Sequence, residues 1–178
     1  MNTSAQLTRP TDTWPAFTTH SPGDVVIAAV SLVRLVEWCG TPCVHTADAT
    51  DPSTHGHPSD TELASVVIAR VTSVELRSDL LLHVGIDADL AGCRPTGATA
   101  VLIGRASTSA VASARLGSGR TFATSLPADV VVGDLVVIPC EGVTTLHDVK
   151  LASSVTSRTR PGRDAAGFDP TPSAAPGR

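Results

Sequence analysis

Residues 80–89 read Leu80-Leu81-Leu82-His83-Val84-Gly85-Ile86-Asp87-Ala88-Asp89, and this stretch decides the expected fold. Apolar residues at the even positions alternate with mostly polar residues at the odd positions, which is the period of two expected for a strand with one buried face. The apolar segment 66–76 precedes it, and the connection at residues 77–79 is short. The two segments therefore predict an antiparallel hairpin.

The rest of the chain repeats this pattern of short apolar segments and turns. We expect further strands at residues 100–105, 111–116, 120–124, 130–132, 135–139 and 143–151. Gly117-Ser118-Gly119 is expected to form the tip of a second hairpin. About seven to nine short strands predict a mainly β domain, either a small antiparallel barrel of the oligonucleotide-binding or SH3-like kind or a sandwich.

The composition agrees with a single small β domain. The chain has 178 residues, of which 42% are hydrophobic but only 3% aromatic, and it contains no Tyr. Its interior must therefore be filled mostly by Val, Leu, Ile and Ala, and branched side chains favour strands. A chain of this length predicts one hydrophobic core.

Residues 24–38 allow two interpretations. A helix would be capped by Ser21, would have Pro22 at its first position and would end at Gly40. Five Val and one Ile in these fifteen residues favour a strand instead. Because the rest of the chain reads as β, we predict a long, bent strand.

The two ends of the chain are predicted to be flexible arms around a domain at residues 22–151. Residues 1–21 are rich in Thr, Ser and Pro, and we expect their apolar side chains, Trp14 and Phe17, to bind a partner. Residues 152–178 form a basic tail rich in Pro, Ala and Gly, which is typical of a disordered segment.

Charge divides the chain into an acidic body and a basic tail. Residues 1–149 carry 8 Arg against 15 Asp or Glu, and residues 150–178 carry one Lys and 4 Arg against 2 Asp, which gives net charges of −7 and +3. An acidic body repels phosphate. Nucleic acid would therefore be bound only through the tail, by Arg158, Arg160 and Arg163.

Residues 39–62 are predicted to be a loop outside the barrel, and they concentrate Cys and His. Zinc prefers thiolate sulfur and imidazole nitrogen as ligands, so this loop is a candidate structural zinc site. Its ligands would be Cys39, Cys43, His55 and His57, with His45 as an alternate. The Cys-x3-Cys spacing is loose and a Gly separates the last two His, so we prefer a polar loop without any cofactor.

The sequence indicates no enzyme. It contains no Gly-x-Ser-x-Gly motif and no Gly-rich phosphate-binding motif. Cys93 and Cys140 lie near strand ends, where we expect small buried thiols.

The chain begins with no visible signal peptide, and its longest apolar stretch is shorter than a membrane span. We therefore expect no membrane association and a cytoplasmic protein, or a virion protein when phage-encoded.

The preferred functional hypothesis is a structural or assembly module, such as a virion component, that forms homo-oligomers through its arms. A nucleic-acid-associated barrel and a zinc-stabilised regulator are the alternatives.

Overall fold

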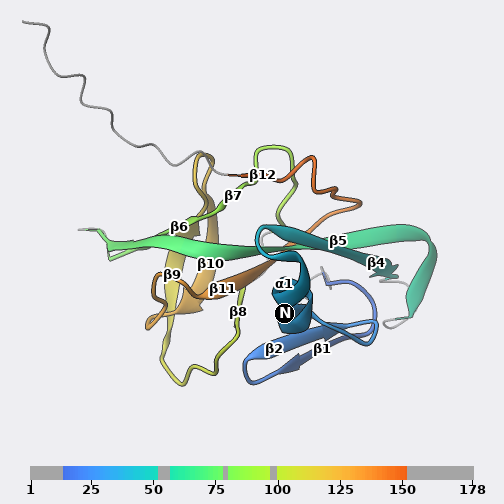
Figure 1. The fold of residues 1–178 in the computed structure, drawn as a ribbon, viewed down its shortest axis with the longest axis horizontal. Coiled ribbons are helices and arrows are strands. Elements are labelled where there is room, and N and C mark those ends of the chain that lie inside the picture. The colour runs from blue at the N-terminus through green and yellow to red at the C-terminus, as the bar shows by residue number, and fades with distance from the viewer. Residues whose placement is uncertain (1–13, 52–56, 78–79, 97–99, 152–178) are drawn as a thin grey trace, which may run out of the picture.

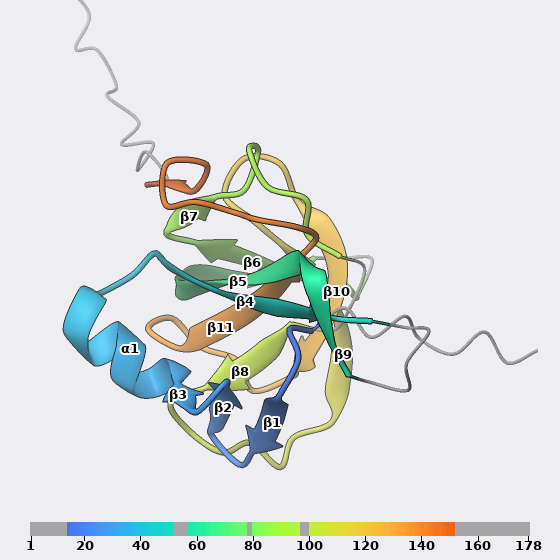
Figure 2. The ribbon, with the colours of Figure 1, turned by 90° about the vertical axis from the view of Figure 1, so that its right-hand side faces the viewer.

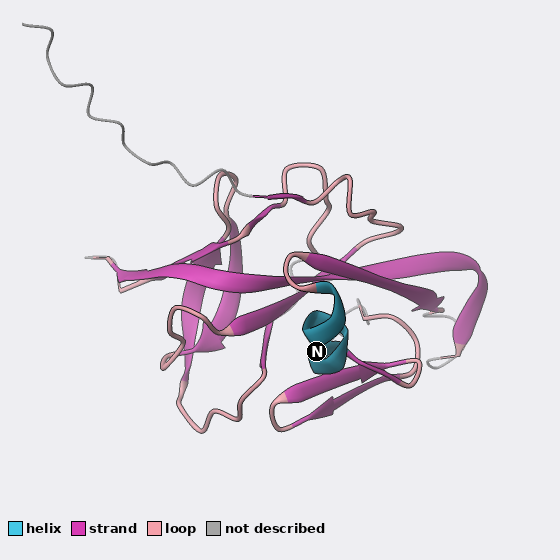
Figure 3. Cartoon of the chain, in the orientation of Figure 1, coloured by secondary structure: helices cyan, strands magenta, loops and turns pink. Residues whose placement is uncertain are grey.

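The computed structural model describes residues 14–51, 57–77, 80–96 and 100–151. These residues form a mainly β structure with one short helix (Figure 1, Figure 3). The elements are β1 (Thr18–Ser21), β2 (Asp24–Ile27), β3 (Val30–Ser31), α1 (Leu32–Cys39), β4 (Cys43–Thr50), β5 (Pro58–Leu76), β6 (Leu82–Ile86), β7 (Ala88–Asp89), β8 (Val101–Ile103), β9 (Val111–Leu116), β10 (Phe122–Pro127), β11 (Leu135–Cys140) and β12 (Lys150–Leu151). No helix within the described residues is long and apolar enough to cross a bilayer.

The largest sheet forms a nearly closed barrel. Its strand order is β10-β9-β6-β5-β11-β8, and β4 also pairs with β5. β8 returns towards β10, where the Ala100 N–H donates to Thr124 Oγ1 at 2.9 Å. The predicted barrel-like β fold is confirmed. The prediction of purely antiparallel pairing is wrong at one place, because β6 and β9 are parallel.

The central strand β5 is buried on both faces. Val67 and Ala69 point into the first core, inside the barrel, whereas Val66 and Ile68 belong to a second core on its outer side. A strand covered on both faces needs a continuous apolar run. β6 has only one buried face, which is why residues 82–86 alternate.

The second core lies between the barrel and a layer made of α1 and the small sheet β1-β2-β3 (Figure 2). Val25 and Ile27 of β2 and Leu32 and Val36 of α1 are buried in it. The sequence predicts a single core, and the structure has two because this layer covers the outer face of β5 and β11.

The predicted long strand at residues 24–38 is wrong after Ile27, because the chain reverses at residues 28–29 into the antiparallel strand β3 and then forms α1. The Ser31 hydroxyl accepts a hydrogen bond from Arg34 N at 3.2 Å, so Ser31 rather than Ser21 is the N-cap of the helix. The same hydroxyl donates to Asp24 Oδ2 at 2.6 Å, which joins the helix start to β2. Gly40 ends the helix with a φ of 74°.

Part of the predicted N-terminal arm belongs to the folded domain. Within the predicted arm 1–21, residues 14–21 belong to the domain, because β1 pairs with β2 and the Ala16 N–H donates to Asp48 O at 2.7 Å. Residues 1–13 and the predicted tail, 152–178, lie outside the described residues.

Three further segments differ from their predictions. The predicted loop 39–62 contains β4, which pairs with β5 from Cys43 opposite Ile68 to Thr50 opposite Pro58. The predicted strand 130–132 lies in a turn. Within the predicted strand 143–151, only residues 150–151 are a strand.

Candidate functional site

The two cysteines of the candidate zinc site have different surroundings. Cys39 is exposed at the last residue of α1, whereas Cys43 begins β4 and is buried in the second core. Burial, with smaller contributions from Cys39 and Asp87, raises the pKa of the Cys43 thiol to about 11. The Cys43 side chain is therefore a neutral part of the apolar core.

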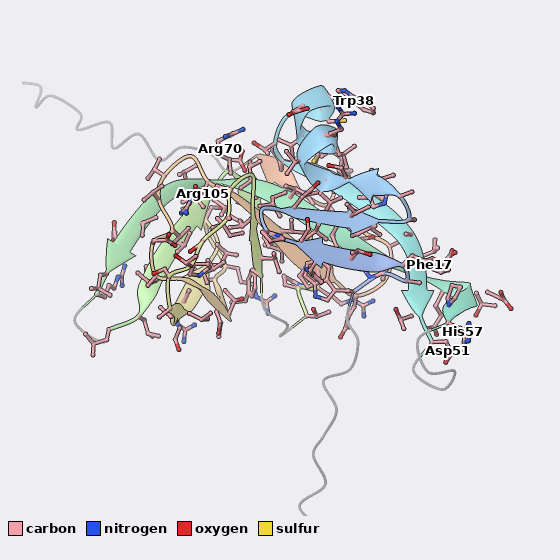
Figure 4. All side chains as sticks on the ribbon, turned by 90° about the horizontal axis from the view of Figure 1, so that it is seen from below. Phe17, Trp38, Asp51, His57, Arg70 and Arg105 are labelled. Carbon is pink, nitrogen blue, oxygen red and sulfur yellow. The ribbon has the colours of Figure 1, made fainter. Side chains whose placement is uncertain are left out.

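The structure does not bring His57 to these cysteines. The Asp51 N–H donates to His57 O at 2.9 Å, which places His57 beside the far end of β4. At the usual rise of a strand, Asp51 lies about 26 Å from Cys43. Figure 4 shows His57 near Asp51 and away from α1, which carries Trp38, the neighbour of Cys39. The donor atoms of two ligands of one zinc ion lie within about 4 Å of each other, so Cys43 and His57 are too far apart to share an ion.

Zinc binding by this segment stays a prediction, but one ion cannot use both Cys43 and His57. In the part of the chain that the structure describes, no three His, Cys, Asp or Glu side chains are grouped so that they could hold a metal ion. His55 falls outside that part.

His45, the alternate ligand, lies between β4 and the layer that covers it. The Ile27 carbonyl accepts a hydrogen bond from its imidazole. The other nitrogen, Nε2, is buried and has no hydrogen-bond partner among the described residues. Burial lowers the pKa of His45 below its ordinary value. His45 is therefore a half-buried residue that is neutral at neutral pH.

Of the two predicted partner-binding residues, Trp14 packs on its own domain. Its half-buried ring contacts the second core and lies edge-on to the His20 ring, with the ring centres 4.8 Å apart. Phe17 is 68% exposed and has a φ of 58°, which is rare for a residue with a bulky side chain. Phe17 therefore remains available to a partner, whereas Trp14 is largely occupied.

The sequence analysis did not single out Trp38 as a candidate binding residue. Its side chain is 81% exposed at the outer end of α1 (Figure 4). Val36, buried on the inner face, precedes it by two positions, and two positions turn a helix by about 200°. The exposure of Trp38 follows from the helical periodicity once the helix start at Leu32 is known.

Trp38 shares the outer side of α1 with two charged residues. Arg34 and Glu37 are both exposed, and residues three and four apart in a helix are neighbours on its surface. We call Arg34, Glu37 and Trp38 the α1 surface. It combines a large aromatic side chain with one positive and one negative charge.

Comparison with known proteins identified no relative of this chain. No model of a known protein family matches this chain, and no curated protein matches it significantly. The candidate site is therefore defined by geometry alone, and it is the α1 surface. The predicted nucleic-acid contacts Arg158, Arg160 and Arg163 lie outside the described residues.

Proposed function

We propose that this protein is a non-enzymatic structural module that assembles with further copies of itself, as a component of a virion or of another particle. The observation that carries the proposal is the 81% exposure of Trp38. Trp is enriched among the residues that contribute most to protein interfaces, because it buries a large area with few rotatable bonds. An assembly contact would remove this surface from water.

The charges of the α1 surface suit a second copy as the partner. In a two-fold symmetric contact, each residue meets the same patch of the other subunit. Two antiparallel copies of α1 would bring Arg34 of one copy to Glu37 of the other. Trp38 would then lie next to this charge pair, towards each end of the contact.

The charge distribution of the whole chain also favours self-association. The body carries −7 and the segment 150–178 carries +3, so the tail of one copy attracts the body of another. In this proposal the segments 1–13 and 152–178 add subunit contacts to those of α1. Phe17, exposed where the first segment joins the domain, is the second apolar contact residue.

Light scattering on the eluting full-length protein tests the proposal. The monomer has a mass of 18.2 kDa, and we expect a larger particle for the natural chain and a monomer for Trp38→Ala. The matched control is Leu146→Ala, because Leu146 is also an exposed apolar residue but lies in the loop before β12. A monomeric natural chain, or an unchanged mass for Trp38→Ala, would reject the proposal.

A charge exchange sharpens the test. Arg34→Glu and Glu37→Arg each place like charges opposite one another in a two-fold contact, so each is expected to weaken association. The double variant restores opposite charges and is expected to restore association. Additive losses in the double variant would contradict the two-fold arrangement.

Nucleic-acid binding through the tail is a second candidate, which the positive charge of residues 150–178 favours. It predicts that filter-bound nucleic acid falls steeply with salt and disappears on truncation after Leu151. The self-assembly proposal requires neither result. Zinc in stoichiometric amount in the purified protein would support the zinc-stabilised regulator instead.

A further inference from the structure

A cavity of about 310 Å³ opens where the loop after β7 meets the β9–β10 hairpin. Its lining residues are Leu90, Cys93, Arg94, Pro95, Arg120, Thr121 and Phe122. It is separate from the α1 surface, since none of its lining residues belongs to α1 or to the strands β1–β3.

The cavity has an apolar floor and a charged rim. Leu90 and Cys93 are buried members of the first core, and the half-buried Phe122 packs against that core. Arg94 and Arg120 are exposed and come from different segments of the chain. Binding sites for small molecules commonly combine apolar walls with a few polar groups in this way.

Backbone hydrogen bonds fix the segment that carries Arg94. The Cys93 N–H donates to Leu90 O at 3.0 Å, which closes a turn just before Arg94. The Arg94 carbonyl accepts from the Glu141 N–H at 3.0 Å, which joins the loop to the end of β11. The rim position of Arg94 therefore exists before any ligand arrives.

The hairpin that carries Arg120 is held to the same end of the barrel. The Ser118 hydroxyl donates to Ala88 O at 2.8 Å, and the Gly117 N–H donates to Val84 O at 3.1 Å. Since Ala88 belongs to β7, the strand that leads into the Arg94 loop, the two arginine segments are connected. A cavity formed in advance binds with a smaller loss of conformational entropy.

Neither guanidinium group at the rim forms an ion pair within the described residues, whereas Arg105 pairs with Asp129 and Asp134. The two positive charges of Arg94 and Arg120 line one cavity in a body whose net charge is −7. Arg provides several N–H donors that match a carboxylate or a phosphate group.

Two carboxylates near the floor of the cavity bind their own turns. Burial raises the pKa of the Cys93 thiol, and Asp148 and Asp89 add to this rise, which places both carboxylates near Cys93. Asp89 Oδ1 accepts from the Ala91 N–H at 3.0 Å, and Asp148 Oδ2 accepts from the Thr145 N–H at 2.9 Å. These carboxylates thus stabilise loop geometry and leave the two arginines free for a ligand.

We infer that this cavity binds a small organic anion, with a phosphate monoester or carboxylate attached to an apolar or aromatic group. Arg94 and Arg120 hold the anionic group, and Leu90 and Phe122 contact the apolar part. The volume is at the lower end of the usual range for ligand sites, which suits a single-ring compound. The acidic body repels long polyanions more strongly than it repels one small anion.

Titration of the ¹⁵N-labelled full-length chain with phenyl phosphate tests this inference. We expect the amide signals of residues 93–95 and 120–122 to shift, and we expect Arg94→Gln and Arg120→Gln each to weaken binding by about tenfold or more. Arg115→Gln is the control, because Arg115 is exposed on β9 outside the lining set, and it should change the affinity by no more than about twofold. An equal loss in the control would overturn the inference.

Three further compounds test which part of phenyl phosphate is needed for binding. Phenol lacks the anion and inorganic phosphate lacks the ring, so both are expected to bind more weakly than phenyl phosphate. Equal binding of inorganic phosphate would overturn the inference, because it would show simple charge pairing without the cavity. Benzoate is expected to bind at the same residues, and the tighter of benzoate and phenyl phosphate identifies the preferred anionic group. Unshifted signals of the lining residues with both of these ligands would also overturn it.

Discussion

Arg105 donates two hydrogen bonds to the carboxylate of Asp134, from Nε to Oδ1 at 2.9 Å and from Nη2 to Oδ2 at 2.7 Å. Arg105 follows β8 and Asp134 directly precedes β11, so this bidentate pair joins two neighbouring strands at one end of the barrel. The Asp134 side chain is only 9% exposed, and its Oδ2 also accepts from the Val131 N–H. The pair therefore shapes the turn in which the sequence predicts a strand at 130–132.

Removing the charge of Asp134 should destabilise the protein. Asp134→Asn keeps the size of the side chain but loses the ion pair, and we expect the free energy of unfolding to fall by about 1–2 kcal/mol. Urea denaturation measures this change. Asp129→Asn is the control, since Asp129 is the more exposed partner of Arg105 and should cost less. Equal losses in the two variants would contradict a special role for Asp134.

His45 should make the protein sensitive to mild acid. Its pKa is lowered below the ordinary value of 6.5, because burial disfavours the charged form. The unfolded chain therefore takes up this proton at a higher pH than the folded chain does. The neutral His45 therefore contributes to the free energy of unfolding. This contribution is complete above pH 6.5 and is lost as the pH falls through the pKa of His45 in the folded state.

The variant His45→Gln tests this pH dependence, because Gln stays neutral and retains an N–H donor for the Ile27 carbonyl. We expect the free energy of unfolding of the natural chain to fall more steeply below pH 6.5 than that of the variant. His147→Gln, at an exposed position, should behave like the natural chain. If the free energy of unfolding falls as steeply below pH 6.5 in His45→Gln as in the natural chain, His45 is not the cause of the acid sensitivity.

Ser65 connects three parts of the structure and is fully buried. Its hydroxyl accepts from the Thr144 N–H at 2.8 Å and lies 2.8 Å from Thr46 Oγ1. Ser65→Ala leaves the Thr144 N–H without its partner, so we expect a loss of about 1–3 kcal/mol in chemical denaturation. Ser113→Ala, on the exposed face of β9, should stay within about 0.5 kcal/mol of the natural chain. Similar losses of unfolding free energy in Ser65→Ala and Ser113→Ala would contradict the role of the Ser65 hydroxyl in connecting these parts.

The two-residue turn between β2 and β3 is not optimal for its conformation. Ala28 and Ala29 have φ values of 48° and 68°, and such turns favour Asn-Gly. The double change Ala28→Asn with Ala29→Gly should stabilise the protein by about 1 kcal/mol and raise Tm by about 2–4 °C. Ala123→Gly, in β10, should lower Tm instead, because Gly weakens a strand. A lower Tm for the turn variant would mean that its backbone is not strained.

Local sequence patterns predict those parts of the fold in which one strand face is buried. The alternation around Val84 and the turn at Ser118 correctly predict the β5–β6 and β9–β10 hairpins. The parallel pairing of β6 with β9 leaves no local signal, because two other strands, β7 and β8, lie between them in the chain order.

The remaining differences have two physical causes. The segment after Ser31 contains β-branched residues, but its N-cap and the burial of Leu32 and Val36 outweigh strand propensity. β4 contains polar residues that are typical of loops, yet Cys43 and Ala47 on one face contact the second core. For the candidate site, the exposure of Trp38 depends on the same helix and could not be predicted from a strand.

Because β5 contributes to both cores, the layer formed by α1 and the sheet β1-β2-β3 cannot be removed without exposing part of the second core. A fragment starting at β4 would leave Val66, Ile68 and Val137 bare, although all three are fully buried in the intact chain. Such a fragment would expose a contiguous apolar sheet face and would be prone to aggregate. The natural unit for expression and for unfolding experiments therefore begins no later than Trp14, and both cores should melt in one cooperative transition.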